Sequence, residues 1–121
     1  MKTVFYLESC STCKKILEAW QLPKTVQRVE IKNNPIDELQ LQAMYERSCS
    51  YEALFSKRAR LYQERGLANQ QLDEQDYKSL LLEHYTFLKR PVLIWENLIS
   101  IGNSKKTVAT AQEWINESEK N

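Results

Sequence analysis

The sequence has very little glycine, proline or histidine: 2 glycines, 3 prolines and 1 histidine in 121 residues. Flexible linkers between domains are usually rich in glycine, serine or proline, and no stretch of this chain has that composition. A chain of this length normally folds around one hydrophobic core without disulfide bonds to support it. We therefore expect a single domain that spans residues 1–121.

The chain also lacks a long hydrophobic run and an excess of either charge. No segment approaches the roughly 18 successive apolar residues of a membrane helix, and the apolar run at residues 4–7 is too short for a signal peptide. With 17 basic and 16 acidic residues, the net charge of +1 gives no overall attraction to nucleic acid or to an anionic membrane. We expect a cytoplasmic protein that binds no membrane and makes no direct contact with nucleic acid.

The chain does contain two cysteines in a C-x-x-C spacing. Cys10 and Cys13 follow the apolar run at residues 4–7, in the sequence CSTCKK. In a reducing compartment, an odd number of cysteines with one such pair indicates redox or metal chemistry rather than a framework of structural disulfides. One pair supplies only half of a tetrahedral zinc site, and the remaining candidates, Cys49 and His84, are isolated from each other in the sequence. We therefore predict no metal site.

The first third of the chain has the pattern of a strand, a helix and a second strand. Residues 3–7 have the pattern of a short buried strand, and residues 11–20 place their apolar side chains at helical spacing. Residues 25–31 are rich enough in β-branched side chains for a second strand. A helix of about ten residues between two strands suits a parallel crossover, so we predict a parallel βαβ unit.

The middle of the chain is predicted to be helical. Asn34 can cap a helix and Pro35 suits its first turn, so one helix should begin there and run to about residue 47. A second helix is expected over residues 51–65, where a glycine follows, and a third near Asp73, whose carboxylate can cap it.

The last third reads as a hairpin followed by a helix. The apolar runs 92–95 and 98–101 are separated by two residues, which suits a tight turn between antiparallel strands. Ser104 can cap a final helix, whose end at residues 117–121 we expect to be frayed. The whole order is α/β: a βαβ unit and then a ββα unit in a mixed sheet. This is the order of a thioredoxin-like core with a helical insertion at about residues 35–89.

The start of the first helix is the expected reactive site. There, unpaired N–H groups and the positive end of the helix dipole favour a thiolate at Cys10, and Lys14 adds positive potential. Cys10 is thus the predicted nucleophile, and Cys13, one turn later, can resolve a mixed disulfide formed at Cys10. Ser11 and Thr12 are small enough to leave the sulfur accessible and can donate hydrogen bonds to it. The alternative is that both cysteines are simply packed in the core.

The dipeptide Arg90-Pro91 is the second informative feature. A cis bond before a proline that leads into a strand would place the backbone of Arg90 beside the redox thiol. Arg90 could then bind an anion or stabilise the thiolate. The alternative is that Pro91 only starts the strand and that Arg90 is solvated.

Three other features leave two interpretations open. Cys49 could relay a disulfide from the first pair, although we favour a packed side chain. His84 could be a general base, although with no partner in the sequence we favour a position at a helix end. A basic group in the middle of the chain could bind a partner, although acidic neighbours favour a solvated helix face. Its members are Lys57, Arg58, Arg60 and Arg65.

Four segments that follow one another along the chain resemble the ArsC and Spx family. They are CSTCKK, ALFSKRARLYQERGL, LKRPVL and ISIGNS, and they are distributed over nearly the whole sequence. The resemblance implies a thioredoxin-like core with a helical insertion. Because the loop holds two cysteines, the chain is more similar to the Spx and thiol-reductase branch than to the arsenate reductases.

The resemblance also implies roles for individual residues. Arsenate reductases of this family attack arsenate with the first cysteine of the loop, hold the oxyanion with three arginines, and rely on glutathione and glutaredoxin for recycling. Cys10 and Arg90 match that pattern, whereas Ser56 stands where a second arginine is expected, and the position expected for the third falls near Gly102 or Asn103. Each such contact is worth about 1.5 to 3 kcal/mol, so arsenate capture should be weak unless Arg58 or another basic side chain substitutes.

We derive three hypotheses for the function. The first is a cytoplasmic thiol-disulfide oxidoreductase in which Cys10 attacks, Cys13 resolves and Arg90 orients a small thiol or oxyanion. It needs no bound cofactor; glutathione is the implied thiol donor, and glutaredoxin or thioredoxin the implied protein partner. The second is a redox-sensing regulator of the Spx type that binds the α subunit of RNA polymerase, and the third is a glutathione-dependent arsenate reductase. The residues expected to bind the substrate or thiol are Ser11, Thr12, Lys14, Arg58 and Pro91.

Overall fold

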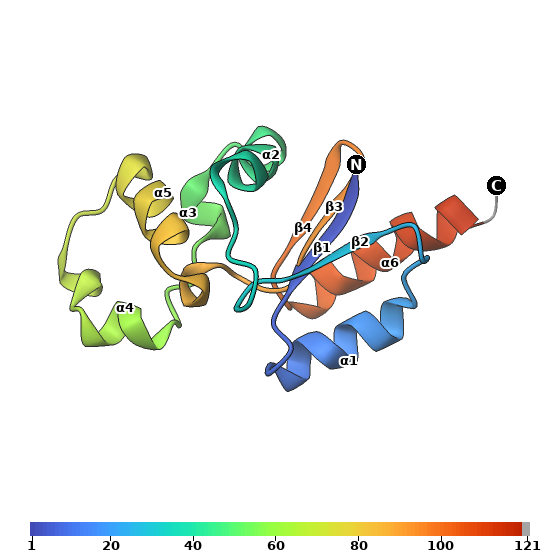
Figure 1. Cartoon of the computed structure of the whole chain (residues 1–121), viewed down its shortest axis with the longest axis horizontal. Helices are drawn as coiled ribbons and strands as arrows, with labels where there is room; N and C mark the ends of the chain where they lie inside the picture. The colour runs from blue at the N-terminus through green and yellow to red at the C-terminus, as the bar shows by residue number, and fades with distance from the viewer. Residues whose placement is uncertain (120–121) are drawn as a thin grey trace. The chain divides into compact units, whose positions relative to one another are not determined.

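The computed structural model describes residues 1–119, apart from the side chain of residue 119, and shows an α/β fold (Figure 1). The strands are β1 (Lys2–Tyr6), β2 (Gln27–Glu30), β3 (Val92–Trp95) and β4 (Leu98–Ile101). The α-helices are α1 (Ser11–Trp20), α2 (Glu38–Ser48), α3 (Tyr51–Leu54), α4 (Arg60–Glu64), α5 (Glu74–Glu83) and α6 (Lys105–Glu119). Two short 3-10 helices are η1 (Leu67–Asn69) and η2 (Tyr85–Phe87).

The chain divides into two compact units. The first unit consists of Met1–Asn34 together with the chain from Arg90 onward, and it holds the four strands, α1 and α6. The second unit is Pro35–Lys89, and it holds α2 to α5 and both 3-10 helices. The interpretation of the chain as a single domain with an insertion stays a prediction.

The four strands form one mixed sheet in the order β2-β1-β3-β4. β1 and β2 are parallel, with Phe5 opposite Val29. β1 and β3 are antiparallel, with Phe5 opposite Val92, and β3 pairs with β4 in an antiparallel hairpin in which Val92 lies opposite Ile101. The predicted βαβ and ββα units in a mixed sheet are therefore confirmed, and this topology is that of the thioredoxin-like fold.

The core of the first unit lies between the sheet and two helices. α1 and α6 are in contact with each other, and Figure 1 shows both on one face of the sheet. The fully buried Trp20 connects them, because its indole N–H donates a hydrogen bond of 3.1 Å to the backbone carbonyl of Val108 in α6. Burial of each large side chain there contributes about 1.5 to 3 kcal/mol, which fixes α1 on the sheet. The buried residues of this core are Val4, Ile16, Leu17, Trp20, Leu22, Val26, Leu93, Trp95, Ala111 and Ile115.

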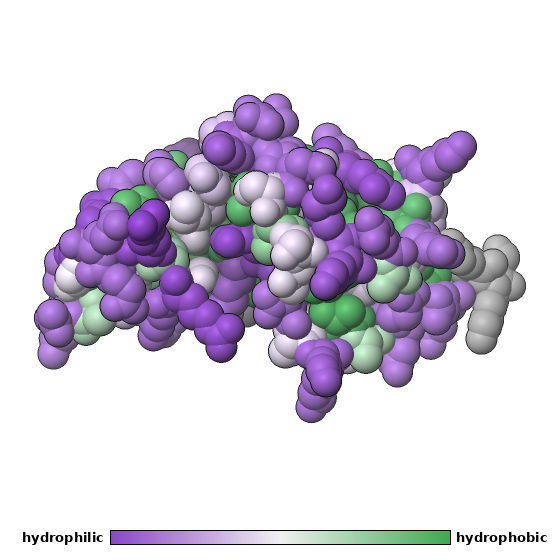
Figure 2. All heavy atoms as spheres, turned by 90° about the horizontal axis from the view of Figure 1, so that it is seen from below, coloured by the Kyte–Doolittle hydropathy of each residue, from purple (hydrophilic) through white to green (hydrophobic). Residues whose placement is uncertain are grey.

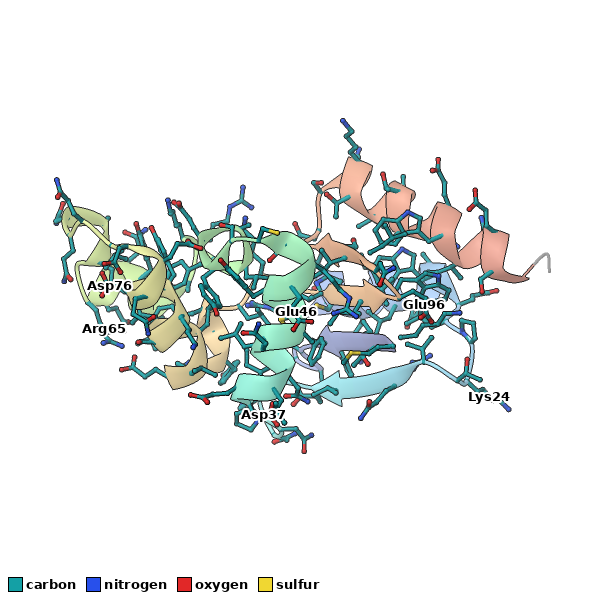
Figure 3. All side chains as sticks on the ribbon, turned by 90° about the horizontal axis from the view of Figure 1, so that it is seen from above. Lys24, Asp37, Glu46, Arg65, Asp76 and Glu96 are labelled. Atoms are coloured by element: carbon teal, nitrogen blue, oxygen red, sulfur yellow. The ribbon has the colours of Figure 1, made fainter. Side chains whose placement is uncertain are left out.

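In the second unit, α2 begins later than the sequence suggested. The predicted cap at Asn34 is wrong, because the Asp37 carboxylate accepts a hydrogen bond of 2.8 Å from the backbone N–H of Gln40. The side chain of Gln40 in turn accepts one of 3.0 Å from the N–H of Asp37. This reciprocal capping box satisfies two backbone donors and starts the helix at Glu38; Figure 3 shows Asp37 at this end of α2. The same arrangement at Asp73 starts α5, as predicted.

The single helix predicted over residues 51–65 is also wrong. The structure has α3 and α4 instead, separated by a single bridge residue, Phe55, and a turn at residues 57–58. In this segment the N–H of Ser56 donates to the carbonyl of Phe87 at 2.7 Å, and the N–H of Lys89 donates to the carbonyl of Leu54 at 2.8 Å. The backbone thus pairs with a segment more than thirty residues away in place of continuing the helix.

The final helix begins where the sequence predicted. Ser104 Oγ accepts a hydrogen bond of 3.2 Å from the N–H of Thr107, which satisfies a donor in the first turn of α6. Residues 117–119 are helical, so the expected fraying is wrong for them, and residues 120 and 121 lie outside the described part of the chain.

The protein surface carries little continuous hydrophobic area on the face shown in Figure 2. That face is mostly hydrophilic, and its hydrophobic residues form small separate patches. Large exposed hydrophobic side chains are found at Met1, Leu39 and Leu98. Among residues 1–119, no helix has the length and apolar character needed to span a bilayer.

Candidate functional site

Cys10 lies at the junction of β1 and α1, where it is the N-cap residue of the helix. Its N–H donates to the carbonyl of Leu7 at 3.1 Å and closes a turn, and its carbonyl accepts the first helical hydrogen bond from Lys14, also at 3.1 Å. The thiol is partly exposed. Cys10 therefore lies at the positive end of the dipole of α1, as the sequence predicted.

Three donors act on the sulfur of Cys10. Partial burial raises the pKa of this thiol, but hydrogen bonds from the backbone N–H of Cys13, from the Arg90 guanidinium and from the Cys13 thiol outweigh that effect. The positive charge of Arg90 acts in the same direction. The pKa of Cys10 is therefore lowered, and a larger share of it is thiolate at neutral pH than for an ordinary cysteine.

Cys13 has the opposite character. Its side chain is fully buried, and burial is the main reason that its pKa is raised to about 11. The nearby Cys10 sulfur raises the pKa further, while a backbone hydrogen bond from Leu7 and the charge of Arg90 lower it. At neutral pH the pair therefore consists of an accessible sulfur with thiolate character and a hidden protonated one.

Arg90 lies beside the thiol pair at the start of the strand β3. Its peptide bond with Pro91 is cis, the first of the two arrangements that the sequence left open. The side chain is half-buried, and Nε has no solvent exposure and no hydrogen-bond partner among the described residues. A buried N–H without an acceptor is costly, so an anionic group bound there would be stabilised.

Replacing Arg90 by methionine should make Cys10 less reactive. Methionine keeps much of the apolar volume but removes the charge and the hydrogen bonds that lower the Cys10 pKa. The rate of alkylation by iodoacetamide at pH 7 should fall about three- to tenfold, because the pKa of the thiol rises and a smaller share of it is thiolate.

Arg90→Lys, which keeps the positive charge but not the planar guanidinium, is the matched control. Its alkylation rate at Cys10 should fall less than that of Arg90→Met. The measurement is the pH profile of alkylation at Cys10, followed by mass spectrometry. An unchanged profile in Arg90→Met would show that the arginine does not act on the thiol.

The other predicted binding residues are distributed over both units. Ser11 and Thr12 are exposed in the first turn of α1, and Pro91 is buried. Lys14 forms an exposed ion pair with Glu8 at 3.4 Å, a contact that contributes little to stability. Arg58 belongs to the second unit, where it lies exposed in the turn before α4, and its substrate-binding role stays a prediction.

The remaining basic side chains and Cys49 lie in the second unit. The exposed Cys49 ends α2 in a left-handed conformation, φ +59°, so the packed interpretation is wrong. His84 lies at the end of α5, as favoured, and accepts a hydrogen bond from Thr86 N–H at 3.2 Å. Three members of the basic group form ion pairs on the surface of their own unit, as expected for a solvated face. These pairs are Lys57 with Glu52, Arg60 with Glu64, and Arg65 with Glu83.

One residue that the sequence analysis did not identify also contacts the thiol loop. The carboxylate of Glu30 accepts a hydrogen bond of 2.9 Å from the backbone N–H of Glu8. Its only signal in the sequence is an acidic residue at the end of a strand before a polar turn, and that pattern is too common to single it out. Within residues 1–119, no three His, Cys, Asp or Glu side chains are grouped so that they could hold a metal ion.

Comparison with known proteins places this geometry in context. A model of the ArsC family matches residues 5–111. The global transcriptional regulator Spx of Bacillus subtilis strain 168 is 24% identical over 111 residues, which cover 89% of this chain and 84% of that protein.

Two solved structures have the same fold. An arsenate reductase from Vibrio cholerae has a TM-score of 0.73 at 18% identity, over 90% of this chain and 95% of that one. An arsenate reductase related protein from Brucella melitensis has a TM-score of 0.65 at 19% identity, over 90% and 92% of the two chains. At these identities the likeness supports the fold alone.

Proposed function

The chain belongs to the ArsC family, and on that basis we propose that it is a cytoplasmic thiol-disulfide oxidoreductase that works through Cys10 and Cys13. The observation that carries this proposal is the contrast between the two thiols. Cys10 is accessible and lies beside Arg90 with a lowered pKa, whereas Cys13 is buried with a raised one. Such a contrast suits a nucleophile that attacks first and a second thiol that reacts afterwards.

The first step is attack by the Cys10 thiolate on one sulfur of a substrate disulfide. The substrate S–S bond breaks, a mixed disulfide forms at Cys10, and the other half leaves as a thiolate that takes a proton from water. In the second step Cys13 gives up its proton and attacks the Cys10 sulfur, which expels the second half as a thiolate. The protein ends with a Cys10–Cys13 disulfide, and the substrate has gained two electrons.

The cycle closes when a thiol donor reduces the Cys10–Cys13 disulfide. Two molecules of a small thiol such as glutathione, or one dithiol protein of the glutaredoxin or thioredoxin type, supply the two electrons. Arg90 has two roles in this proposal. Its guanidinium favours the thiolate of Cys10, and its free Nε offers a hydrogen bond to an anionic group of the substrate or thiol.

A second candidate function is redox sensing. It is favoured by the likeness to Spx, which is a global transcriptional regulator. In this case the same thiol pair would switch between dithiol and disulfide without turnover, and the oxidised or reduced form would bind the α subunit of RNA polymerase. The chemistry at Cys10 is identical in both proposals, so only turnover and binding separate them.

The test measures turnover and binding on the same purified chain. Reduction of bis(2-hydroxyethyl) disulfide by glutathione is followed with the wild type and with Cys10→Ser, and the polymerase α C-terminal domain is used as bait for both redox forms. Turnover that requires Cys10, with no capture in either state, supports the oxidoreductase. Redox-dependent capture without turnover supports the regulator. In a parallel assay with arsenate as the substrate and glutathione as the reductant, turnover that requires Cys10 would establish the third hypothesis instead.

A further inference from the structure

We propose that Glu30 is a positioning residue for Cys10: its carboxylate holds the turn that presents the thiol at the start of α1. The inference rests on the proposed function, because a precisely held thiol matters only if Cys10 is the reacting group. Glu30 is the last residue of β2 and lies opposite Tyr6 at the end of β1. It therefore stands beside the point at which the chain leaves the sheet for the thiol loop.

The Glu30 carboxylate accepts three backbone hydrogen bonds. One oxygen, Oε2, accepts the N–H of Glu8 at 2.9 Å. The other, Oε1, accepts the N–H groups of Lys32 at 3.0 Å and Asn33 at 2.8 Å. A charged acceptor strengthens each of these bonds, so this one side chain joins the loop before α1 to the turn after β2.

The bond to Glu8 fixes the turn that ends at Cys10. Leu7 and Cys10 close this turn with a backbone hydrogen bond of 3.1 Å, and Glu8 and Ser9 between them are exposed. No packing of the two central side chains can therefore hold the turn in place. The N–H of Ile31 also donates to the carbonyl of Tyr6 at 2.9 Å, so Glu30 extends the contact between the two strands by one step, into the loop.

The direction in which loss of Glu30 shifts the pKa of Cys10 distinguishes an effect of its charge from an effect of its positioning. Partial burial raises the pKa of Glu30, but the hydrogen bonds from Glu8, Asn33 and Lys32 lower it more, so the carboxylate is ionised at neutral pH. A negative charge can only disfavour a thiolate, so loss of the Glu30 charge alone would leave the reactivity of Cys10 unchanged or raise it. Loss of positioning would have the opposite effect, because the sulfur would move away from the helix start and from Arg90.

The experiment measures the pH profile of iodoacetamide alkylation at Cys10 in the full-length wild type and in Glu30→Ala and Glu30→Gln. In Glu30→Ala we expect a midpoint at least about half a pH unit higher, which is a threefold slower reaction at pH 7. Glu30→Gln loses the charge but keeps one acceptor oxygen, so its midpoint should lie between those of the wild type and Glu30→Ala.

Asp37→Ala is the matched control. Asp37 is also a carboxylate that accepts a backbone N–H, but it caps α2 in the other unit. Its loss should lower the thermal midpoint of unfolding and leave the Cys10 profile unchanged, so general destabilisation is distinguished from positioning.

The possible results separate this inference from the proposed function. A lowered midpoint in the wild type that rises in Glu30→Ala supports both. A lowered midpoint in the wild type that stays the same or falls in Glu30→Ala and Glu30→Gln overturns the positioning role only. An ordinary thiol profile in the wild type overturns the proposed function and the role of Glu30 with it. If Glu30→Ala does not fold, the midpoint of Glu30→Gln decides by the same criterion.

Discussion

Cys10→Ser should leave no disulfide-exchange activity above the rate without protein, whereas Cys13→Ser should stop at the mixed disulfide after a normal first step. A serine hydroxyl is not a nucleophile toward disulfides at neutral pH, so nothing replaces the thiolate at position 10. In Cys13→Ser the attacking sulfur and Arg90 are both present, but no second thiol expels the bound half of the substrate. The loss in Cys10→Ser is expected to span several orders of magnitude.

Intact-protein mass spectrometry after reaction with an aromatic disulfide distinguishes these outcomes. Cys13→Ser should accumulate one substrate half per chain at Cys10, and the wild type should instead accumulate an internal disulfide. Substitution of the exposed Cys49 is the control, and it should leave both results unchanged. An internal disulfide that forms in Cys13→Ser would mean that Cys49 is the resolving thiol, and the proposed pairing would be wrong.

The second large effect is the pH dependence of resolution. The Cys13 pKa of about 11 in the dithiol state leaves about one molecule in ten thousand as thiolate at pH 7. Once Cys10 is in a mixed disulfide, its negative charge is gone, so the pKa of Cys13 should fall below that value. Burial remains the main contribution, so the pKa should still lie above that of an ordinary thiol. The second step should therefore accelerate about tenfold for each pH unit from 6 to 8.

Release of thionitrobenzoate from an adduct at Cys10 gives this rate by absorbance in a single turnover. Cys13→Ser, which carries the same adduct without a resolving thiol, gives the background at each pH. The expected first step is less dependent on pH over the same range, because Cys10 starts from a lowered pKa. A resolution rate that is flat between pH 6 and 8 would show that Cys13 is not the buried, protonated group described above.

The elements that the sequence predicted well are those set by local pattern. The helix Ser11–Trp20 and the strands Val92–Trp95 and Leu98–Ile101 have the bounds that their apolar spacing indicated. One error arose from a contact within such a local pattern. Asp37 caps α2 in place of Asn34, because it shares a reciprocal pair of hydrogen bonds with Gln40.

The larger errors come from contacts between residues far apart in the chain. Propensity alone favours one helix over residues 51–65, but backbone hydrogen bonds from the segment 87–89 interrupt it. Glu30 was missed for the same reason, because its bond to Glu8 spans 22 residues. The pair Cys10 and Cys13 was found because its signal is four residues long. Arg90 was found because a proline follows it, which is also a short-range signal.

The left-handed backbone at Cys49 has a practical consequence for a variant in which Cys10 and Cys13 are the only cysteines. With φ at +59°, residue 49 has a backbone conformation that glycine adopts at no steric cost and that asparagine tolerates. Serine has no such advantage in this conformation. A glycine or asparagine at position 49 therefore removes the spare thiol and suits the backbone better than the usual serine. Thiol counting would then report on Cys10 and Cys13 alone, in a chain that is no less stable than the natural one.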